Sequence, residues 1–347
     1  MAKPYKTSME HPNLDGLTPD RIMQLAWGYA PPLILQAALH HHVFDVLDSG
    51  PMTIQELENA TGASSRGLSA ILHALVALDF LTKDPWERFA LTPESSTFLV
   101  STKASFQGGI LQHCSQQLIP AWLSINDVVA SGSPAVAVNQ EKSGENFFHK
   151  FVEDLFPLSY PAACLLAKEF KIPDHQDPFT VLDLAAGSGV WGIALAQQSD
   201  MVKVTAVDWP GVIWVTRRTV TRLGLAKRFR FVAGDLLDVD FGEGYQAATL
   251  GHILHSEGEQ RSRDLLHKVY HSLAMGGRIA IAEFLVDDTK TYPLSSALFA
   301  VNMLVNTDYG DTYSFGEIRD WLSDVGFIDI QEFEAPGPSP LILAKKP

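Results

Sequence analysis

The stretch TVLDLAAGSGVWG, residues 180–192, decides the fold of this 347-residue chain. It opens with an apolar run of strand length, and WGIALAQQ at 191–198 has the apolar content of a buried helix. The small residues between them let the backbone approach a ligand closely, and the first turn of the helix offers free amide groups to an anion. The stretch therefore predicts a strand, a ligand-binding turn from Asp183 to Gly189, and a helix that begins near Val190.

Similar units follow along the second half of the chain. Helices are predicted at 212–224 and 261–274, and strands at VKVTAVD (202–208), FRFVAGD (229–235), AATLGHIL (247–254) and RIAIAEFL (278–285). Alternating strands and helices form a doubly wound, mainly parallel sheet, which binds its ligands at the carboxyl ends of the strands. We therefore expect an α/β, Rossmann-like fold with its functional residues directly after the strands.

The first half has a different, mainly helical pattern. Apolar residues recur at helical spacing in five segments: 20–38, 53–59, 64–79, 106–131 and 144–171. The segment 80–92 predicts a short hairpin that turns at Asp84 and Pro85. Two helices followed by a hairpin form a winged-helix-like pattern, which suggests DNA binding and makes a winged-helix regulator one alternative function.

The charge pattern argues against DNA as the ligand. Residues 1–110 hold 7 Lys and Arg against 11 Asp and Glu, and the helix that would enter the groove, SSRGLSAILHALVAL, carries one Arg. Phosphate contacts need clustered basic side chains. The whole chain has a formal charge of −14, which also opposes binding to nucleic acid and to anionic membranes. We expect a scaffold role for this helix and a small-molecule partner for the protein.

Composition indicates a globular protein of two domains. Hydrophobic residues make up 46% of the chain and charged residues 19%. The sequence shows neither an apolar run of membrane-spanning length nor a secretory signal, so a cytoplasmic location is expected. Cys114 and Cys164 lack metal-ligand spacing, so no metal site is expected. The segment IPDHQDPF (172–179) is typical of a boundary, which predicts a helical dimerisation and substrate domain at 1–172 and a catalytic domain at 173–347.

Carboxylates follow three successive predicted strands: Asp183, Asp208 and Asp235. A carboxylate after the second strand can accept both hydroxyls of a ribose, and Asp235 with Leu236 would face an adenine. Each acid alone has a plainer interpretation as a cap of a turn or helix. The residues 187–192 also spell GxGxxG, so an NAD-dependent oxidoreductase is a further alternative.

The motifs VLDLAAGSG, AVDWPG, AGDLLD, ILHSEGEQRSRDLL and MGGRIAIAEF together resemble the class I methyltransferases, in particular the caffeate and acetylserotonin O-methyltransferase-like family. The segments 33–81 and 89–100 resemble that family's winged-helix-like dimerisation domain. The resemblance implies a homodimer that transfers a methyl group from S-adenosyl-L-methionine to a hydroxyl of a small aromatic or polyketide-like metabolite, releasing S-adenosyl-L-homocysteine. It implies the following cofactor-binding positions: Asp183, Ala185, Gly187, Gly189, Asp208, Trp209, Gly234, Asp235, Leu236, Gly251 and His252.

Two positions depart from the pattern of the resembling family. The family usually has a glycine where this chain has Ala185, and a methyl group fits there only if the backbone angle is ordinary. A basic or aromatic residue that often stands shortly before the family's catalytic histidine is replaced by Gly251 or His252. These departures concern the affinity for the cofactor more than its identity.

A histidine follows the fourth predicted strand, where a base would be needed. A phenol with a pKa near 10 is mostly protonated at pH 7, and a neutral imidazole can accept its proton. His255 precedes SEGE (256–259), which spells a capping box and would place the ring at the positive end of a helix dipole. The resembling family has its catalytic base here, usually followed by an aspartate in place of Ser256. His252, three residues earlier on the strand, is expected to point to the opposite face.

The resembling family holds its base between two acids. Glu283, which closes the fifth predicted strand, matches the first of them. Asp311 is the nearest substitute for the second, although a solvated loop is the plainer interpretation of that segment. A branch of the family that includes pigment carbon methyltransferases also has serine after the fourth strand, so carbon methylation stays an alternative to oxygen methylation.

The acceptor pocket is expected to be built from helices that flank the site, although ordinary core packing explains each of its candidate residues taken singly. These candidates are Trp122, Phe148, Phe156, Tyr160, Phe299, Asn302, Met303 and Asn306.

Overall fold

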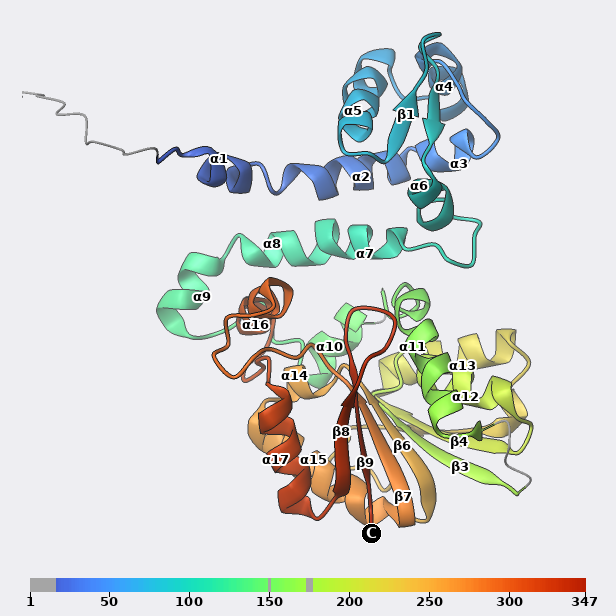
Figure 1. Cartoon of the computed structure of the whole chain (residues 1–347), viewed down its shortest axis with the longest axis vertical. Helices are drawn as coiled ribbons and strands as arrows, with labels where there is room; N and C mark the ends of the chain where they lie inside the picture. The colour runs from blue at the N-terminus through green and yellow to red at the C-terminus, as the bar shows by residue number, and fades with distance from the viewer. Residues whose placement is uncertain (1–16, 149–150, 173–176) are drawn as a thin grey trace, which may run out of the picture. The chain divides into compact units, whose positions relative to one another are not determined.

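The computed structural model describes residues 17–148, 151–172 and 177–347 (Figure 1). The chain divides into two compact units, Met1–Thr92 and Pro93–Pro347. The predicted boundary after residue 172 differs from this division, and part of it falls on residues 173–176, outside the described ranges. The two divisions differ because α11 (Phe156–Glu169) packs closely against α12 (Val190–Gln198). The assignment of separate functions to 1–172 and 173–347 stays a prediction.

The N-terminal unit consists of short helices and a hairpin. Its elements are α1 (Asp20–Ala26), α2 (Ala30–His40), α3 (Val43–Leu47), α4 (Ile54–Thr61), α5 (Ser65–Ala77), β1 (Leu81–Lys83) and β2 (Phe89–Leu91). The antiparallel pairing of β1 with β2 confirms the predicted hairpin. The helix predicted over 20–38 is divided between α1 and α2, because Gly28 is a poor helix former and Pro31 suits a helix start. Leu68, Leu72 and Leu75 give α5 a buried face, in keeping with its predicted scaffold role.

A run of helices opens the C-terminal unit. It comprises α6 (Pro93–Phe98), α7 (Gly108–His113), the π-helix η1 (Cys114–Leu118), α8 (Ile119–Trp122), α9 (Ile125–Ser131), α10 (Glu141–Phe148) and α11. The prediction of one helix over 106–131 was wrong in detail: Pro120 has no amide hydrogen to donate to the preceding turn, and the hydrogen bonding changes to the π type before it. The helix predicted over 144–171 is likewise divided into α10 and α11, and its residues 149 and 150 lie outside the described ranges.

In the described part of the chain, seven strands form one sheet in the order β5-β4-β3-β6-β7-β9-β8. Their bounds are β3 (Phe179–Leu184), β4 (Val202–Asp208), β5 (Phe229–Ala233), β6 (Tyr245–Gly251), β7 (Leu273–Ala282), β8 (Ile328–Phe333) and β9 (Leu341–Lys345). The strands β3 to β7 pair in parallel, and β9 pairs antiparallel with both β7 and β8. This arrangement confirms the doubly wound sheet. The strand order reverses between β3 and β6, where such sheets form a ligand crevice.

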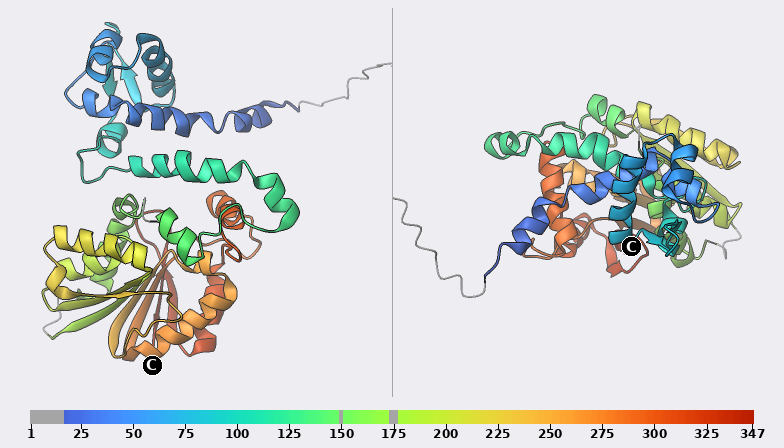
Figure 2. Two further views of the ribbon diagram at one scale, coloured as in Figure 1. Left: turned by 180° about the vertical axis from the view of Figure 1, so that it is seen from behind. Right: turned by 90° about the horizontal axis from the view of Figure 1, so that it is seen from above.

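Helices cover both faces of the sheet, and alternation along the strands divides the core between them. Val181 of β3 faces α11, α12 and α13 (Pro210–Arg222), whereas its neighbour Leu182 faces α15 (Glu259–Ser272) and α17 (Phe315–Val325). Successive side chains of a strand point to opposite faces, so both must be apolar in a sheet covered on both sides. Figure 2 shows α13 in yellow and α15 in orange on either side of the twisted sheet. The remaining elements are η3 (Ala226–Arg228), α14 (Leu254–Glu257) and α16 (Leu294–Asn306).

Candidate active site

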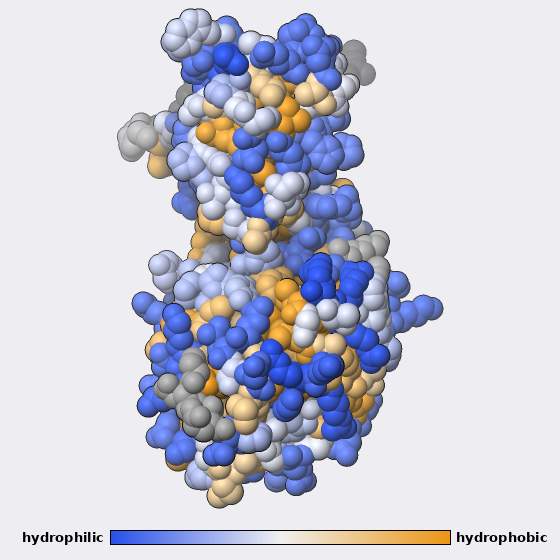
Figure 3. Space-filling model, turned by 90° about the vertical axis from the view of Figure 1, so that its right-hand side faces the viewer, coloured by the Kyte–Doolittle hydropathy of each residue, from blue (hydrophilic) through white to orange (hydrophobic). Residues whose placement is uncertain are grey.

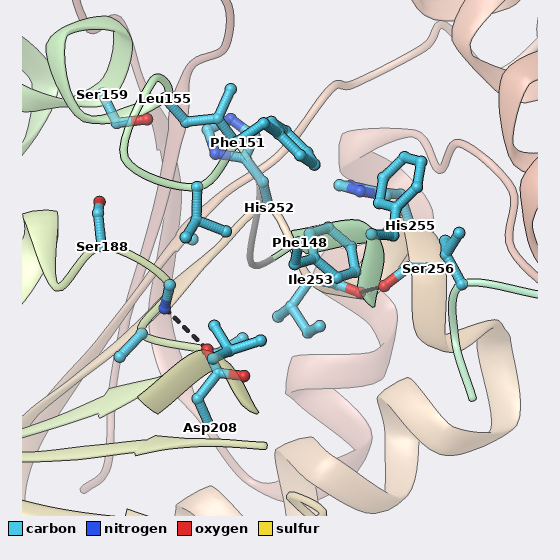
Figure 4. Close-up of a pocket in the computed structure, with 18 of the residues that line it drawn as sticks. Phe148, Phe151, Leu155, Ser159, Ser188, Asp208, His252, Ile253, His255 and Ser256 are labelled. Carbon is cyan, nitrogen blue, oxygen red and sulfur yellow. Dashed lines mark hydrogen bonds between the residues drawn. The ribbon is translucent and has the colours of Figure 1, made fainter. Parts of the chain in front are cut away.

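A cavity of about 280 Å³ lies at the carboxyl ends of β3, β4, β5 and β6. Figure 4 shows Asp208 and Ser188 on one side of it and His255 and Ser256 on the other. The wall includes most of the residues predicted from the sequence: Phe148, Ala185, Gly187, Asp208, Trp209, Gly234, Asp235, Leu236, Gly251, His252, His255, Phe299, Asn302, Met303 and Asn306.

The turn after β3 adopts left-handed backbone angles. Gly187 and Gly189 have φ of +56° and +81°, and α12 begins at Val190 as predicted. Ala185 also has a positive φ, +50°. The condition stated for Ala185, an ordinary backbone angle, is therefore not met, and its methyl group is accommodated with backbone strain.

Asp183 and Gly189 shape this turn from outside the cavity wall. The carboxylate of Asp183 is fully buried and accepts hydrogen bonds from Gly192 N at 3.0 Å and from the Thr249 hydroxyl at 2.7 Å. Burial raises the pKa of Asp183 to about 7. A Cβ at Gly189 would approach Thr216 Cγ2 to 2.8 Å, so this position needs glycine for space as well as for its angle. Asp183 thus connects α12 to β3, and Gly189 lets the turn pass close to α13.

Asp208, the last residue of β4, connects this strand to the turn after β3 by a hydrogen bond. Its Oδ2 accepts a hydrogen bond from Gly187 N and its Oδ1 accepts one from Trp209 N, each at 2.8 Å. Burial raises the pKa of this carboxyl to about 6. Because a carboxylate has about four acceptor positions, two remain for donors in the cavity.

On the next loop, Asp235 and Leu236 follow β5 after Gly234, whose φ is +144°. Leu236 is buried, and Asp235 is partly buried and paired with Arg261 at 2.8 Å. Arg261 also contacts Glu257 at 2.6 Å. The acidic and apolar side chains that were predicted to face an adenine thus lie side by side on the cavity wall.

His255 is held by Glu283, the residue that follows β7. The Nδ1 atom of His255 lies 2.7 Å from Glu283 Oε1. Glu283 is fully buried, and burial alone would raise its pKa, but the adjoining His255 ring and its hydrogen bond lower that pKa below the ordinary value. An ionised carboxylate only accepts hydrogen bonds, so Nδ1 carries the proton and Nε2 carries the free lone pair. The Phe299 ring stands edge-on to the imidazole, with ring centres 4.9 Å apart.

The capping box predicted at Ser256 is absent from the described helix ends around it. His255 and Ser256 lie within the single turn α14, and Ser256 Oγ donates to Ile253 O at 3.0 Å. Gly258, with φ of +79°, separates α14 from α15 and is the N-cap of α15. The dipole of α15 therefore begins beyond His255, and the predicted dipole effect on its ring loses its basis.

His252 lines the same cavity as His255, so the prediction of opposite faces was wrong. The strand β6 ends at Gly251, and His252 has φ of +59°. Strand alternation does not apply beyond that point. Burial lowers the pKa of His252 to about 4, and its Nε2 lies 2.8 Å from Ser339 Oγ.

Asp311 is turned toward solvent rather than toward His255. Its Oδ2 accepts a hydrogen bond from Lys290 Nζ at 2.8 Å, and its side chain is 43% exposed. Its backbone amide donates to His255 O at 3.0 Å, which explains why the loop is near the histidine without supplying an acid. The structure thus favours the plainer interpretation of this residue.

Two asparagines of α16 reach the cavity through an ordered network. Trp122 Nε1 donates to Asn302 Oδ1 at 2.9 Å, and Asn306 Nδ2 donates to the same oxygen at 3.0 Å. This arrangement leaves Asn306 Oδ1 buried and without a hydrogen-bond partner among the described residues. Trp122 thus fixes the side chain of Asn302 from behind the cavity wall. Phe156 and Tyr160, by contrast, pack against the core between α11, α12 and the sheet.

Several residues of the cavity wall were missed by sequence reasoning. Trp191 follows the glycine turn directly, and its position at the start of α12 was a usable signal. Glu257 follows His255 by two residues and is 4% exposed. His113 stacks on Phe151 with ring centres 3.8 Å apart. It comes from a helix far from the strands in sequence, so no local pattern pointed to it.

The parallel sheet, the glycine turn and the strand-end acids together define a nucleotide-binding fold of the class I methyltransferase type. The model of an O-methyltransferase domain matches residues 161–328, and the model of an O-methyltransferase dimerisation domain matches residues 23–101. The chain belongs to this O-methyltransferase family, and it is an S-adenosylmethionine-dependent methyltransferase. The predicted family, fold class and cofactor are thereby confirmed.

Individual relatives extend over nearly the whole chain. The 3-hydroxy-5-methyl-1-naphthoate 3-O-methyltransferase of Streptomyces sahachiroi is 29% identical, over 94% of this chain and 95% of the relative. The tetracenomycin polyketide synthesis 8-O-methyl transferase of Streptomyces glaucescens is 25% identical, over 95% of this chain and 97% of the relative. The crystal structure of human N-acetylserotonin methyltransferase in complex with SAM has a TM-score of 0.82 at 24% identity, covering 95% of this chain and 98% of that one, and shows the same fold.

Proposed function

We propose that this enzyme transfers a methyl group to a hydroxyl of a small aromatic or polyketide-like metabolite, with His255 as the general base. The observation that carries the proposal is the buried pair of His255 and Glu283, which opens into the cavity that Asp208 lines on the other side. The curated relatives support the acceptor class, since one is named for a hydroxynaphthoate and the other for a polyketide.

The residues of the cavity fit S-adenosylmethionine. Asp208 offers acceptors for two ribose hydroxyls, while Asp235 and Leu236 offer an acceptor and an apolar surface to the adenine. The amides and the positive-φ residues of the turn from 185 to 189 would hold the methionine end. When bound, the cofactor supplies a methyl group that its sulfonium has already activated. The chain's own residues then have to position the acceptor and accept its proton.

The acceptor side of the cavity is mainly apolar, with Asn302 and Asn306 as polar positions. Phe148, Phe299 and Met303 supply the apolar surface that an aromatic ring system needs. A buried oxygen without a partner, like Asn306 Oδ1, normally costs stability unless a ligand or water supplies a donor. Because this oxygen is fully buried, we infer that a hydroxyl or N–H of the acceptor molecule donates to it after the Asn306 side chain turns toward the cavity.

The proton of the attacking hydroxyl would pass to His255 Nε2. Glu283 keeps the proton of the free imidazole on Nδ1, so Nε2 is available toward the cavity. When Nε2 takes up a proton, the ionised carboxylate of Glu283 stabilises the resulting positive charge. A positioned base of this kind contributes about two to four orders of magnitude to the rate.

The variant His255→Gln tests the base, with the exposed His267→Gln as its matched control. Turnover of an aromatic hydroxyl compound at pH 7 is expected to fall about 100- to 10,000-fold in His255→Gln, while affinity for S-adenosylhomocysteine is retained. A higher pH that ionises the acceptor should restore much of the rate. Near-native turnover in this variant at pH 7 would count against the base and favour an ionised or carbon nucleophile.

We further propose a homodimer formed through the first half of the chain. The match to a dimerisation domain supports this, and so do exposed apolar side chains on and beside α1: Ile22 (71%), Leu25 (72%) and Trp27 (63%). Figure 3 shows that hydrophobic side chains, in orange, reach the surface of the N-terminal unit. Apolar surface of this kind is typical of obligate interfaces. Light scattering at micromolar concentration is expected to give twice the chain mass, and a clean monomer would refute the proposal.

Membrane attachment by a spanning helix has no support in the described part of the chain, where every helix is too short or too polar to cross a bilayer.

A further inference from the structure

Arg261 lies behind the wall of the cavity, where the mechanism above gives it no role. Its Nη2 donates to both carboxylate oxygens of Asp235, at 3.0 and 2.8 Å, and its Nε donates to Glu257 Oε2 at 2.6 Å. Both carboxylates line the cavity. The guanidinium therefore joins the loop after β5 to α14, the helical turn that carries His255.

The position of Arg261 is unfavourable for a cation unless it is paired. It is the third residue of α15, in the first turn, where the helix dipole favours negative charge. Glu257 is 4% exposed, so burial raises its pKa while Arg261 opposes that shift. An ion pair that is half-exposed at the surface would contribute little to the stability of the fold. Here the guanidinium of Arg261 lies between the carboxylates of Asp235 and Glu257, and Glu257 is buried. Each of the three charges is stabilised by its opposite neighbours.

These contacts fix the carboxylate of Asp235. Its Oδ1 accepts from Leu237 N at 2.8 Å as well as from Arg261. Its Oδ2 accepts from Arg261 alone among the described residues, so it retains an acceptor position. An adenine offers an amino group at its 6-position, whereas a 6-oxo purine presents an oxygen there, which a carboxylate would repel.

We propose that Arg261 is a positioning residue that holds Asp235 ready to accept the adenine amino group, and so sets the selectivity of this enzyme for a 6-aminopurine cofactor. Glu257 anchors the guanidinium from the other side. The proposal rests on the assignment of Asp235 to the adenine under the proposed function. Without Arg261, the carboxylate of Asp235 would rotate away or bind water. The enzyme would then discriminate less between the 6-amino and the 6-oxo purine.

Calorimetric titration with S-adenosylhomocysteine and S-inosylhomocysteine tests this, because the two ligands differ only at the 6-position and at the adjoining N1, which carries a hydrogen in the inosyl ligand alone. The variant is Arg261→Met, which keeps the apolar length of the side chain and removes its donors. The matched control is Arg263→Met on the same helix. Arg263 also pairs with two acids, Glu259 and Asp324, and it lies outside the cavity wall. Arg261→Lys, which can restore a single contact, is the conservative variant.

The wild type is expected to bind S-adenosylhomocysteine at least about tenfold more tightly than S-inosylhomocysteine, the difference of one charge-assisted hydrogen bond. Arg261→Met should weaken the binding of S-adenosylhomocysteine about tenfold. It should also reduce the ratio of the two dissociation constants at least about threefold. Arg261→Lys should give an intermediate ratio, and Arg263→Met should leave both constants unchanged.

Equal weakening of both ligands in Arg261→Met would show a merely structural role and overturn the proposal, as would unchanged binding. If Arg261→Met does not fold, the ratio measured in Arg261→Lys decides: a wild-type ratio overturns the proposal and a reduced one supports it. Failure of the assignment of Asp235 to the adenine has a separate signature, because the wild type itself would then bind S-adenosylhomocysteine without preferring it to S-inosylhomocysteine.

Discussion

Replacing Glu283 with glutamine separates two ways in which this carboxylate can act on His255. Its Oε1 accepts from His255 Nδ1 at 2.7 Å and from Phe284 N at 2.8 Å, and its Oε2 accepts from His255 N at 3.2 Å. A glutamine has one oxygen and one NH₂ group. An oxygen at the Oε1 position keeps the two shorter bonds, so we expect this orientation, in which Nδ1 retains its proton.

Glu283→Gln is therefore expected to remove the negative charge beside His255 and to leave the imidazole proton on Nδ1. Hydrogen bonds to a charged group contribute about 1.5 to 3 kcal/mol, and neutral ones about 0.5 to 1.5 kcal/mol. The difference, about 1 to 2 kcal/mol, corresponds to a fall in turnover of about 5- to 30-fold. Glu283→Leu removes the acceptor as well as the charge and should lose more.

Single-turnover methyl transfer to an aromatic acceptor measures the rate, and ¹H–¹⁵N spectra of the histidine rings report which nitrogen carries the proton. A fall of three orders of magnitude, with the proton on Nε2, would show that the amide adopts the opposite orientation and would refute this reasoning. Unchanged turnover would show that Glu283 does not assist His255.

Two further predictions concern the cofactor turn. The positive φ of Ala185 costs an alanine roughly 1 to 2 kcal/mol, so Ala185→Gly should raise the free energy of unfolding by about 0.5 to 1 kcal/mol after the greater chain entropy of glycine is included. A lower midpoint of thermal unfolding would contradict it. Burial raises the pKa of Asp208 to about 6, and only its ionised form accepts two ribose hydroxyls, so affinity for S-adenosylhomocysteine should fall about tenfold from pH 7 to pH 5. Asp208→Asn should flatten this profile, and a flat wild-type profile would refute the assignment.

The parts of the fold that could be predicted are those with a local signal. The strands β3, β4, β6 and β7 are mostly buried and apolar, the edge strand β5 has the apolar residues Phe229, Phe231 and Val232, and the glycine turn and the strand-end acids follow these strands directly. The strands β8 and β9 were missed. β8, IDIQEF, is an edge strand without a buried residue, and its apolar and polar residues alternate only over residues 328–331, the shortest run that indicates a strand. β9, LILAK, is short and follows a segment rich in proline.

The parts of the site that could not be predicted depend on contacts between distant residues or on local backbone angles. The pairing of Arg261 with Asp235 spans 26 positions, and that of Trp122 with Asn302 spans 180. No local pattern reports such contacts. His252 and Ser256 were misplaced for the other reason: β6 ends at Gly251, three residues before the end of the predicted strand, and Gly258 breaks the helix that the capping pattern implied.

The contact between Gly251 and Trp191 couples the side-chain volumes of two elements. A Cβ at position 251 would overlap the indole nitrogen of Trp191, which is 4% exposed. In the resembling family a bulky basic or aromatic residue often stands near position 251, where the Trp191 indole of this chain leaves no room for a side chain. The two positions therefore form an exchangeable pair: enlarging 251 alone overpacks the wall, and shrinking 191 alone leaves a void, while both changes together conserve the volume. Grafting the usual residue of the family onto position 251 would require a smaller residue at 191 in the same step.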